Sequence, residues 1–467
     1  MYQVPQNISK DKIFIVNRSE IGRRLDPKMA LYNQSVQHSL YPLVKLKSLL
    51  LSKPQYGANE AGLIREHREQ VRYIRITDID ENGLVSTDEL GATVANLEEK
   101  YILNENDIVI ARSGATVGKA YIHRHLPYPC IYAGYLIRFV VDPNKILPDY
   151  LFTYTQLSSY MEWVNAIQRS SAQPNINAEE YQSLEIPLPN LSKQQEIVDY
   201  INEAYTQKRV KEAEAQQLLD SIDGYLLKEL GITIREIKTD IDNRMFVIQR
   251  SELKGRYTPS LYKDAISLYS TIYDNISLSH LAHINPNTRL PYKDNKISIS
   301  FVPMESVNEI YAEIIDDKNC FIADSKGFTR FQEGDLLWAK ITPCMENGKS
   351  AIAKNLINGY GCGSTEFHVI RPKNDDLLVG YVHSLLHMKL VRKTAKLYFG
   401  GSAGQQRVAT DFLEGFNIPL PSKTKQQEIV DYIADIRTRA KTLQEEGKAI
   451  LDDAKHKVEH MIIGEEI

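Results

Sequence analysis

The sequence repeats itself at a distance of half its length. The string Ile-Pro-Leu-Pro at 186–189 returns at 418–421, and the string Gln-Gln-Glu-Ile-Val-Asp-Tyr-Ile at 194–201 returns at 426–433. Both copies are displaced by 232 residues in a chain of 467. Because a repeat this long indicates a duplicated structural unit, the chain is expected to fold as an internal pseudo-dimer with two similar but unequal halves.

Each half divides into a mixed globular part and a long helix. Short apolar runs alternate with Gly, Asn, Asp and Pro turns in the same order in both halves, and they predict strands at 71–76, 107–111, 135–141, 299–304, 335–339 and 367–370. The predicted class is α/β (α+β). The predicted parts are a globular domain at 1–189, a central helix at 190–232, a second domain at 233–421 and a C-terminal helix at 422–467.

Both helices begin with a sequence typical of a capping box. Ser192 is followed by Gln195, and Thr424 by Gln427, directly after the rigid Ile-Pro-Leu-Pro entry. Apolar residues then recur at heptad spacing, with Gly447 as a weak point in the second copy. We expect the two helices to pair antiparallel as a coiled coil and to act as a spacer. The alternative is that each helix packs only on its own domain.

Composition constrains the function loosely. The net charge of −4 lowers the expectation of nucleic-acid binding, although phosphate affinity depends on local basic faces. The four cysteines, Cys130, Cys320, Cys344 and Cys362, lack metal-ligand spacing, so no metal site is expected. Neither a signal-peptide core nor an apolar run of membrane-spanning length occurs, which predicts a soluble, cytoplasmic protein.

A polar, glycine-containing loop follows the matching strand in each half. Arg and Lys can contact guanine or phosphate there, and backbone amides can hold phosphates. The candidate DNA-binding residues in and near these loops are Arg112, Ser113, Thr116, Lys119, Arg169, Ser171, Lys340, Thr342, Asn347, Lys349, Gln405 and Arg407. Salt bridges within the fold are the alternative for Arg112 and Lys340, and bracing of the helix junction is the alternative for Arg169, Ser171, Gln405 and Arg407. Neither loop has the full spacing of a nucleotide-binding P-loop.

The combined pattern resembles the DNA-specificity subunit of type I restriction-modification systems. The resemblance rests on the repeated order of domain, Ile-Pro-Leu-Pro, Gln-Gln-Glu-Ile-Val and long helix, on the loops at 107–119 and 340–349, and on 402–408. It covers essentially the whole chain. It implies two target-recognition domains that each bind half of a split, asymmetric DNA sequence, with the helices between them.

The resemblance also implies partners and the absence of chemistry in this chain. Two methyltransferase subunits and restriction or translocase subunits would assemble on it, and S-adenosylmethionine, ATP and Mg would bind to those partners, with no cofactor and no catalytic residue here. The candidate partner-binding residues lie at the two helix starts: Gln195, Ile197, Ile201, Gln427, Ile429 and Ile433. Two alternatives stay open, namely a recognition subunit of another methylation-based defence system and a pseudo-symmetric scaffold that assembles two partner copies without binding DNA.

Overall fold

The structure, a computed structural model, describes residues 28–30, 32, 39–86, 90–168, 174–233, 268–292, 294–401 and 405–463. Contacts divide the chain into two compact units that do not follow the linear order of the sequence. Unit 1 combines residues 1–210 with residues 446–467, and unit 2 comprises residues 211–445. Each unit therefore contains a part of both long helices, α5 (Leu191–Glu229) and α12 (Lys423–Ile463).

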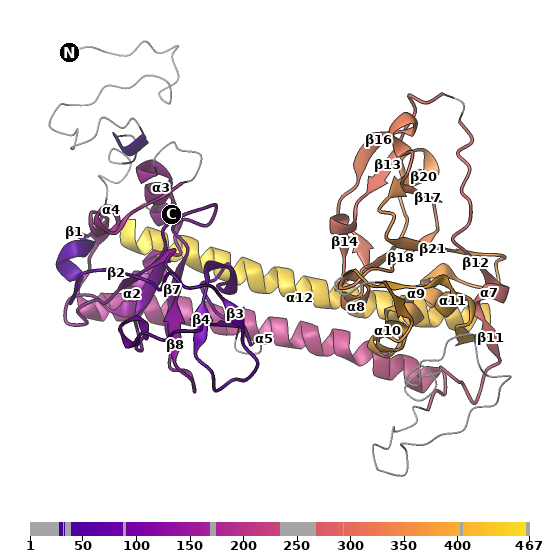
Figure 1. Ribbon diagram of the computed structural model, residues 1–467, viewed down its shortest axis with the longest axis horizontal. Helices are drawn as coiled ribbons and strands as arrows, with labels where there is room; N and C mark the ends of the chain where they lie inside the picture. Colours follow the sequence, from indigo (N-terminus) through magenta and orange to yellow (C-terminus); the bar gives the residue numbers. More distant parts are fainter. Residues whose placement is uncertain are drawn as a thin grey trace. The chain divides into compact units, whose positions relative to one another are not determined.

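Unit 1 contains two four-stranded sheets (Figure 1). The first has the order β2-β9-β6-β7 and is antiparallel throughout, with bounds Gln55–Tyr56, Leu136–Phe139, Ile108–Ala111 and Ala120–Ile122. The second has the order β3-β5-β4-β8, with bounds Leu63–Ile64, Ala92–Thr93, Arg72–Ile74 and Cys130–Tyr132, and only β4 and β8 pair parallel. A small pair joins β1 (Leu43–Lys45) to β10 (Glu185–Pro187). The helices are η2 (Leu46–Leu49), η3 (Ile76–Asp78), η4 (Glu99–Tyr101), α2 (Pro148–Tyr154), α3 (Ser158–Ile167) and α4 (Ala178–Gln182).

Unit 2 repeats the first sheet strand for strand and varies the second. The first has the order β12-β21-β18-β19, with bounds Ala282–Ile284, Phe367–Pro372, Leu336–Ala339 and Ser350–Ile352. The second has the order β16-β13-β20-β17, with bounds Lys318–Phe321, Ser298–Val302, Tyr360–Gly363 and Thr329–Gln332, and β13 and β20 are the parallel pair. The two-stranded pairs are β11 (Asn275–Ser277) with β24 (Asn417–Pro419), β14 (Val307–Asn308) with β15 (Glu313–Ile314), and β22 (Phe399–Gly400) with β23 (Arg407–Val408). All six strands predicted from the sequence are present.

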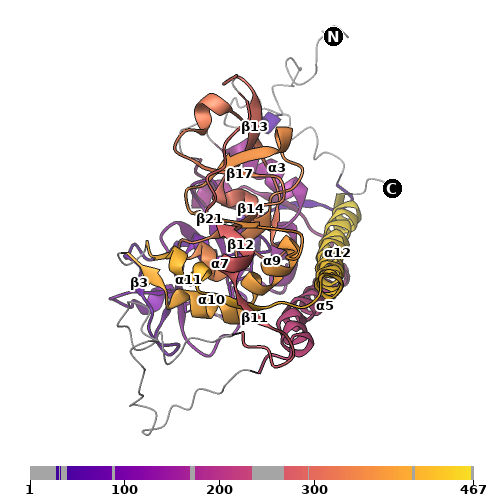
Figure 2. The same cartoon turned by 90° about the vertical axis from the view of Figure 1, so that its right-hand side faces the viewer.

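Short helices complete unit 2. They are α7 (Leu278–Leu281), η7 (Met304–Ser306), η8 (Ile322–Ser325), α8 (Cys344–Asn347), η9 (Ile357–Gly359), α9 (Val379–His387), α10 (Lys389–Lys396) and α11 (Thr410–Glu414). Helix α9 lies against the first half of α12 (Figure 2), where a Cβ at Gly380 would lie 3.1 Å from the Val430 side chain.

The long helices pack on their own domains and on each other. In unit 1, Ile197 and Ile201 near the start of α5 share one apolar core with Trp163 and with Val458 and Ile462 near the end of α12. In unit 2 the opposite ends of the helices meet, because one core there combines the end of α5 with the start of α12. Within each unit the pairing is therefore antiparallel, and the alternative that each helix packs only on its own domain does not hold. The helices contain 39 and 41 residues.

A buried glutamine attaches each helix start to the globular part. Gln194 accepts a hydrogen bond from the Leu147 amide (2.8 Å) and donates to the carbonyl oxygens of Lys145 (3.2 Å) and Pro189 (2.9 Å). In unit 2, Gln426 forms the same three bonds with Leu378, Asp376 and Pro421. The first glutamine of the repeated motif thus has a structural role, because a buried amide is stable only when its hydrogen bonds are satisfied.

The capping residues differ from the prediction. Each helix begins earlier than a capping box at Ser192 or Thr424 allows. The side chain of Asn190 accepts a hydrogen bond from the Lys193 amide (2.9 Å), and that of Ser422 accepts one from the Lys425 amide (3.3 Å). Asn and Ser are both favourable N-caps. Each directly follows a proline, so the helix begins immediately after the extended Ile-Pro-Leu-Pro segment.

One expected weak point of the helix pair is a contact within unit 1. The Cβ position of Gly447 lies 3.4 Å from the carbonyl oxygen of Lys208 and 3.5 Å from its Cγ atom. Lys208 is buried, and the missing side chain of Gly447 leaves room for the aliphatic stem of the lysine.

Across the described residues, no helix is long and apolar enough to cross a membrane.

Candidate nucleic-acid interface

The strand and loop at the centre of each unit are held by the same backbone bonds. The amide of Arg112 donates to the Tyr135 carbonyl oxygen and its carbonyl accepts from the Ile176 amide, both at 2.9 Å. In unit 2, Lys340 forms the corresponding bonds with Glu366 and Val408, also at 2.9 Å. The two cationic residues singled out by the sequence therefore occupy equivalent backbone positions.

Their side chains have different surroundings. The Arg112 guanidinium lies over the Tyr56 ring, 4.8 Å from its centroid, so it is braced by a cation–π contact. Lys340 instead lines an open groove in unit 2 with a volume of about 450 Å³. The two loops therefore share a backbone position but differ in the surroundings of their cationic side chains.

The groove is bounded by the segment after β12, the turn between η8 and β17, and the strand ends of β18 and β21. Its lining is polar and cationic: Asn285, Pro286, Asn287, Thr288, Ser325, Lys326, Gly327, Phe328, Thr329, Arg330, Lys340, Phe367 and Val369. Three of these residues are cations and none is a carboxylate, although the whole chain carries a net charge of −4. Such a local excess of positive charge is what a polyanion requires.

Polar contacts fix the rim of this groove. Asn285, at φ 52°, accepts a hydrogen bond from the Val369 amide (3.0 Å), and its side-chain nitrogen lies 3.0 Å from His368 Nδ1. His368 Nε2 lies 2.9 Å from the Val408 carbonyl oxygen. Burial lowers the pKa of His368, so the imidazole is neutral, with Nε2 as donor and Nδ1 as acceptor. Arg330 is oriented by its hydrogen bond to the Ser325 hydroxyl (2.9 Å).

Sequence reasoning missed most of the groove. Of its cations only Lys340 is among the candidates that the sequence singles out, and no prediction falls on the Asn-Pro-Asn segment at 285–287. The available signal was the Ser-Lys-Gly-Phe turn at 325–328, which combines a cation, a glycine and an exposed aromatic ring.

The two loop lysines bind backbone within the fold. Lys119 donates to the Ile79 carbonyl oxygen. Lys349 donates to the Met304 carbonyl oxygen (3.2 Å) and pairs with Glu309 at 3.6 Å. These contacts favour a structural role for both lysines, since each ammonium group already holds a loop beside the second sheet, and their contact with phosphate stays a prediction.

Several other candidates in unit 2 are engaged close to the loop. Arg407 forms a two-pronged ion pair with Glu366, with Nε to Oε2 at 2.8 Å and Nη2 to Oε1 at 2.7 Å, and Nη1 donates to the Gln405 carbonyl oxygen (2.9 Å). The Thr342 hydroxyl donates to Glu346. These contacts favour a structural role close to the loop for both Arg407 and Thr342, and none of them involves the helix junction.

The remaining candidates are more open or lie elsewhere. The side chains of Thr116, Asn347 and Gln405 are exposed, and Ser113 is half-buried beside Asn175. Arg169 and Ser171 lie outside the described residues. The exposed residues keep their predicted role as a prediction.

The predicted partner-binding set separates into two kinds of residue. Ile197, Ile201, Ile429 and Ile433 are buried in the cores of their own units, so this part of the prediction is corrected. Gln195 and Gln427 are exposed, and each donates to the aspartate one turn later, at 2.8 and 2.7 Å. Of the six predicted partner-binding residues, Gln195 and Gln427 are the two whose side chains are exposed to a partner.

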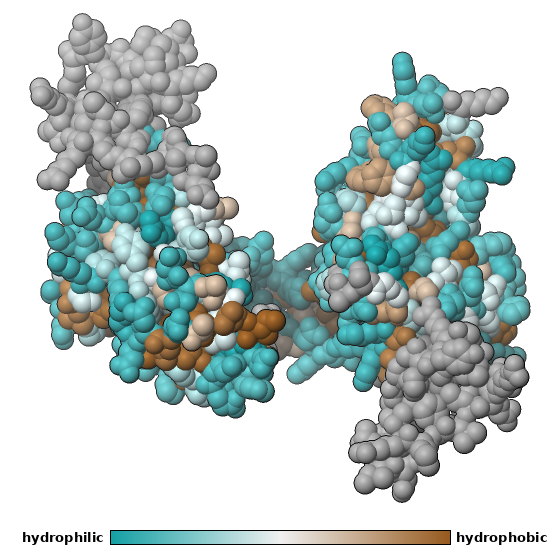
Figure 3. Space-filling view, viewed as in Figure 1, coloured by the Kyte–Doolittle hydropathy of each residue, from teal (hydrophilic) through white to brown (hydrophobic). Residues whose placement is uncertain are grey.

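Unit 1 exposes apolar side chains at the edge of its second sheet. Leu63 and Ile64 form edge strand β3, and 86% of Ile64 is accessible. Figure 3 shows brown side chains gathered over the part of unit 1 that carries β3. Unit 2 also exposes apolar side chains beside its second sheet, at Ile315, Phe321 and Phe328.

Comparison with known proteins identifies the repeated unit. Residues 64–219 and 273–450 match the type I restriction modification DNA specificity domain, once in each half. The specificity subunit of the type I restriction enzyme EcoEI from Escherichia coli is 36% identical over 190 residues, which is 40% of this chain and 31% of that protein. The match thus spans less than a third of that relative.

Other relatives match over more of the chain. The StySPI specificity subunit from Salmonella potsdam is 27% identical over 387 residues, covering 80% of this chain and 76% of that protein. The solved HsdS subunit from Thermoanaerobacter tengcongensis aligns over 91% of this chain and 97% of its own length, with 14% identity and a TM-score of 0.37. Because the domain matches both halves and most of the chain, the protein belongs to the type I restriction-modification DNA specificity family.

Proposed function

We propose that this chain is the sequence-specific DNA-recognition subunit of a type I restriction-modification complex and reads a bipartite, asymmetric site. The observation that carries the proposal is the groove of unit 2, where Lys326, Arg330 and Lys340 gather without a lining carboxylate. Cations of this kind supply phosphate affinity, and the neighbouring polar side chains can face base edges.

The difference between the units supports an asymmetric site. A true homodimer presents the same residues to both half-sites and favours a palindrome. Here the equivalent positions carry Arg112 over a tyrosine ring and Lys340 in an open groove. Two readers with different side chains should select different half-sites.

The proposed partners follow from the family. Two methyltransferase subunits would dock on the chain, and restriction or translocase subunits would join them. S-adenosylmethionine, ATP and Mg would bind to those subunits, while this chain orients them on DNA without catalysing a step. The exposed Gln195 and Gln427 are the proposed contacts at the helix starts.

Binding measured across a range of salt concentrations tests the groove. Lys340→Ala should lower the slope of log affinity against log salt by about 0.9 if the ammonium group contacts one phosphate. The matched control variant is Lys349→Ala. It removes a lysine of the same loop whose ammonium group donates to the Met304 carbonyl oxygen. Its slope should be unchanged. Equal slopes for the wild type and Lys340→Ala, with or without methyltransferase, would contradict the role of the groove and favour the scaffold alternative.

A domain exchange tests the two-reader arrangement. Replacing residues 1–189 by the corresponding domain of a relative should change one half of the methylated motif and leave the other half intact. A change in both halves would show that the domains do not read independently.

A further inference from the structure

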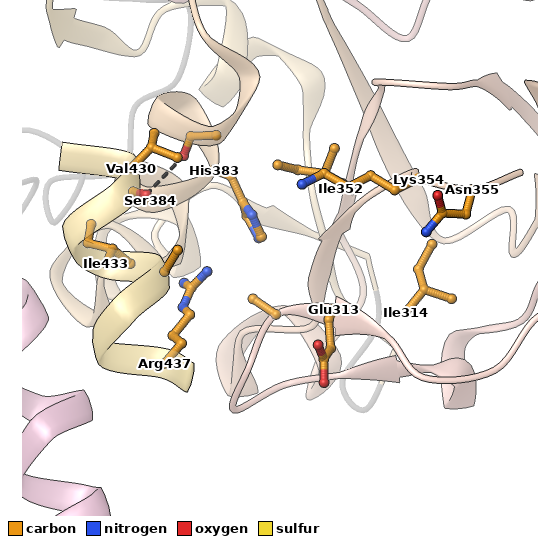
Figure 4. Close-up of a pocket in the computed structure, with 13 residues that line it drawn as sticks. Glu313, Ile314, Ile352, Lys354, Asn355, His383, Ser384, Val430, Ile433 and Arg437 are labelled. Carbon is orange, nitrogen blue, oxygen red and sulfur yellow. Dashed lines mark hydrogen bonds between the residues drawn. The ribbon is translucent and has the colours of Figure 1, made fainter. Parts of the chain in front are cut away.

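Unit 2 contains a second hollow, separate from the groove and enclosed by different elements. It has a volume of about 340 Å³ and is bounded by α9, the first half of α12, β15 and β19 (Figure 4). Charged and polar lining residues include Glu313, Lys354, His383, Ser384 and Arg437. The volume lies at the lower end of the range for small-molecule sites.

Arg437 projects from α12 into this hollow with unmet hydrogen-bonding capacity (Figure 4). Its Nε and Nη2 atoms are buried and have no hydrogen-bond acceptor among the described residues. Burial lowers the pKa of Arg437 to about 10, so the group is still a cation at neutral pH. The Glu313 carboxylate acts on this cation through space, but it accepts no hydrogen bond from Nε or Nη2. Buried donors without an acceptor are costly, and an acceptor that enters the hollow would remove that cost.

The neighbouring side chains do not supply the acceptor. The Glu313 carboxylate is bound by Lys441, with Nζ to Oε1 at 2.6 Å. The Ser384 hydroxyl donates to the Gly380 carbonyl oxygen (2.9 Å). His383 Nε2 lies 3.0 Å from the Ser350 hydroxyl, and burial holds the pKa of His383 well below its ordinary value. The lining thus contains two cations, Arg437 and Lys354, and one carboxylate that is already paired.

Unit 1 fills the equivalent place with rings. Tyr150 and Tyr381 correspond, because each donates its hydroxyl to the carbonyl of the second residue of a repeated Ile-Pro pair, at 2.6 and 2.7 Å. Two residues later stand Phe152 in unit 1 and His383 in unit 2. Likewise Tyr205 stands four residues after Ile201, as Arg437 does after Ile433. Phe152 and Tyr205 pack in the apolar core of unit 1. At these two positions unit 1 therefore carries aromatic rings, whereas unit 2 carries the polar side chains that line the hollow.

We propose that this hollow binds a small oxyanion, a phosphate or a carboxylate, with the Arg437 guanidinium as its main ligand. Guanidinium groups bind such anions through two parallel, charge-assisted hydrogen bonds. Lys354 adds positive charge at the same lining. The site does not depend on DNA recognition, because it lies outside the groove and uses none of its residues.

Titration calorimetry on the full chain tests the proposal, with inorganic phosphate in one arm and succinate in the other, at constant ionic strength set by NaCl. The wild type should show saturable binding, and the arm with the tighter binding identifies the anion class. Arg437→Gln should weaken it by about 10-fold or more, since hydrogen bonds to a charged group contribute roughly 1.5–3 kcal/mol. The matched control is Arg439→Gln, on the same helix with a side chain that is 61% exposed, and it should bind like the wild type.

A second variant keeps the test decisive if Arg437→Gln folds poorly. His383→Phe combined with Arg437→Tyr introduces the residues of unit 1 and should fill the hollow. This variant should show no saturable binding and a higher Tm in chloride alone. Binding of equal strength in the wild type and in either hollow variant would overturn the proposal, as would the absence of saturable binding to the wild type in both arms.

Discussion

The two units share an inner frame and differ in their outer layer. Each has the same four-stranded sheet order, β2-β9-β6-β7 or β12-β21-β18-β19, and the same buried glutamine at the helix start. The second sheets share only one parallel pair of strands, β4 with β8 or β13 with β20. In unit 1 the two further strands both lie on the β4 side, whereas in unit 2 one strand flanks each side of the pair.

This difference shows where the duplicated fold tolerates change. The frame is fixed by buried polar bonds that both units keep, and those bonds place the loop after β6 or β18 in the same position. The outer sheet determines what lies beside that loop. In unit 2 the turn before β17 contributes Lys326 and leads to Arg330, while unit 1 has the exposed apolar edge strand β3 instead. One frame can therefore present two chemistries.

The largest expected effect comes from the shared frame. Gln194→Ala and Gln426→Ala each remove three hydrogen bonds of a buried amide, so each should destabilise its own unit by about 3–4 kcal/mol. Hydrogen exchange followed by mass spectrometry reports the opening free energy of each unit separately. The adjacent exposed glutamines are the controls, and Gln195→Ala and Gln427→Ala should change stability by less than about 0.5 kcal/mol. If only one of the two variants, Gln194→Ala or Gln426→Ala, destabilised its own unit, the two frames would not be equivalent.

An intermediate effect is expected at the loop glycines, which have the same backbone conformation but different neighbours. Gly118 (φ 91°) and Gly348 (φ 95°) both lie in the left-handed region. A Cβ at Gly118 would lie 2.8 Å from the branched side chain of Val164, whereas at Gly348 it would meet the tip of Arg392, which can move. Gly118→Ala should cost about 2–3 kcal/mol and Gly348→Ala about 1–2 kcal/mol. Urea unfolding of both variants measures this difference, and a larger loss for Gly348→Ala would show that Arg392 cannot adjust.

The smallest effect is a pH dependence confined to unit 2. The hydrogen bonds from Arg407 lower the pKa of Glu366, while the equivalent backbone position in unit 1 is occupied by Tyr135. Because the folded pKa is the lower one, the contribution of Glu366 is present above the unfolded value of about 4.3 and is lost as pH falls through the folded value. Acidification from pH 5 to pH 3 should therefore destabilise unit 2 of the wild type more than that of Glu366→Gln. If hydrogen exchange shows the same acid response in both proteins, the ion pair contributes nothing.

Much of this fold could be predicted from the sequence, because its repeats and apolar runs are local signals. The six strands and two long helices follow from patterns within a few residues. The capping residues were placed too late because Asn190 and Ser422 adjoin proline, where the extended entry conceals the first turn. The roles of Lys119 and Lys349 could not be predicted, since a lysine suits a phosphate and a backbone carbonyl equally well. The groove depends on strand β17 lying beside β20, which is a long-range pairing that no local pattern encodes.

The composition of unit 1 from two distant segments has a consequence for protein synthesis. The core that contains Trp163 and Ile197 also contains Leu451, Val458 and Ile462 of α12. During translation these late residues emerge from the ribosome only after the whole of unit 2, a continuous segment at 211–445, has been made. The half that is synthesised first should therefore acquire its final stability last, with its apolar surface in need of chaperone protection until then.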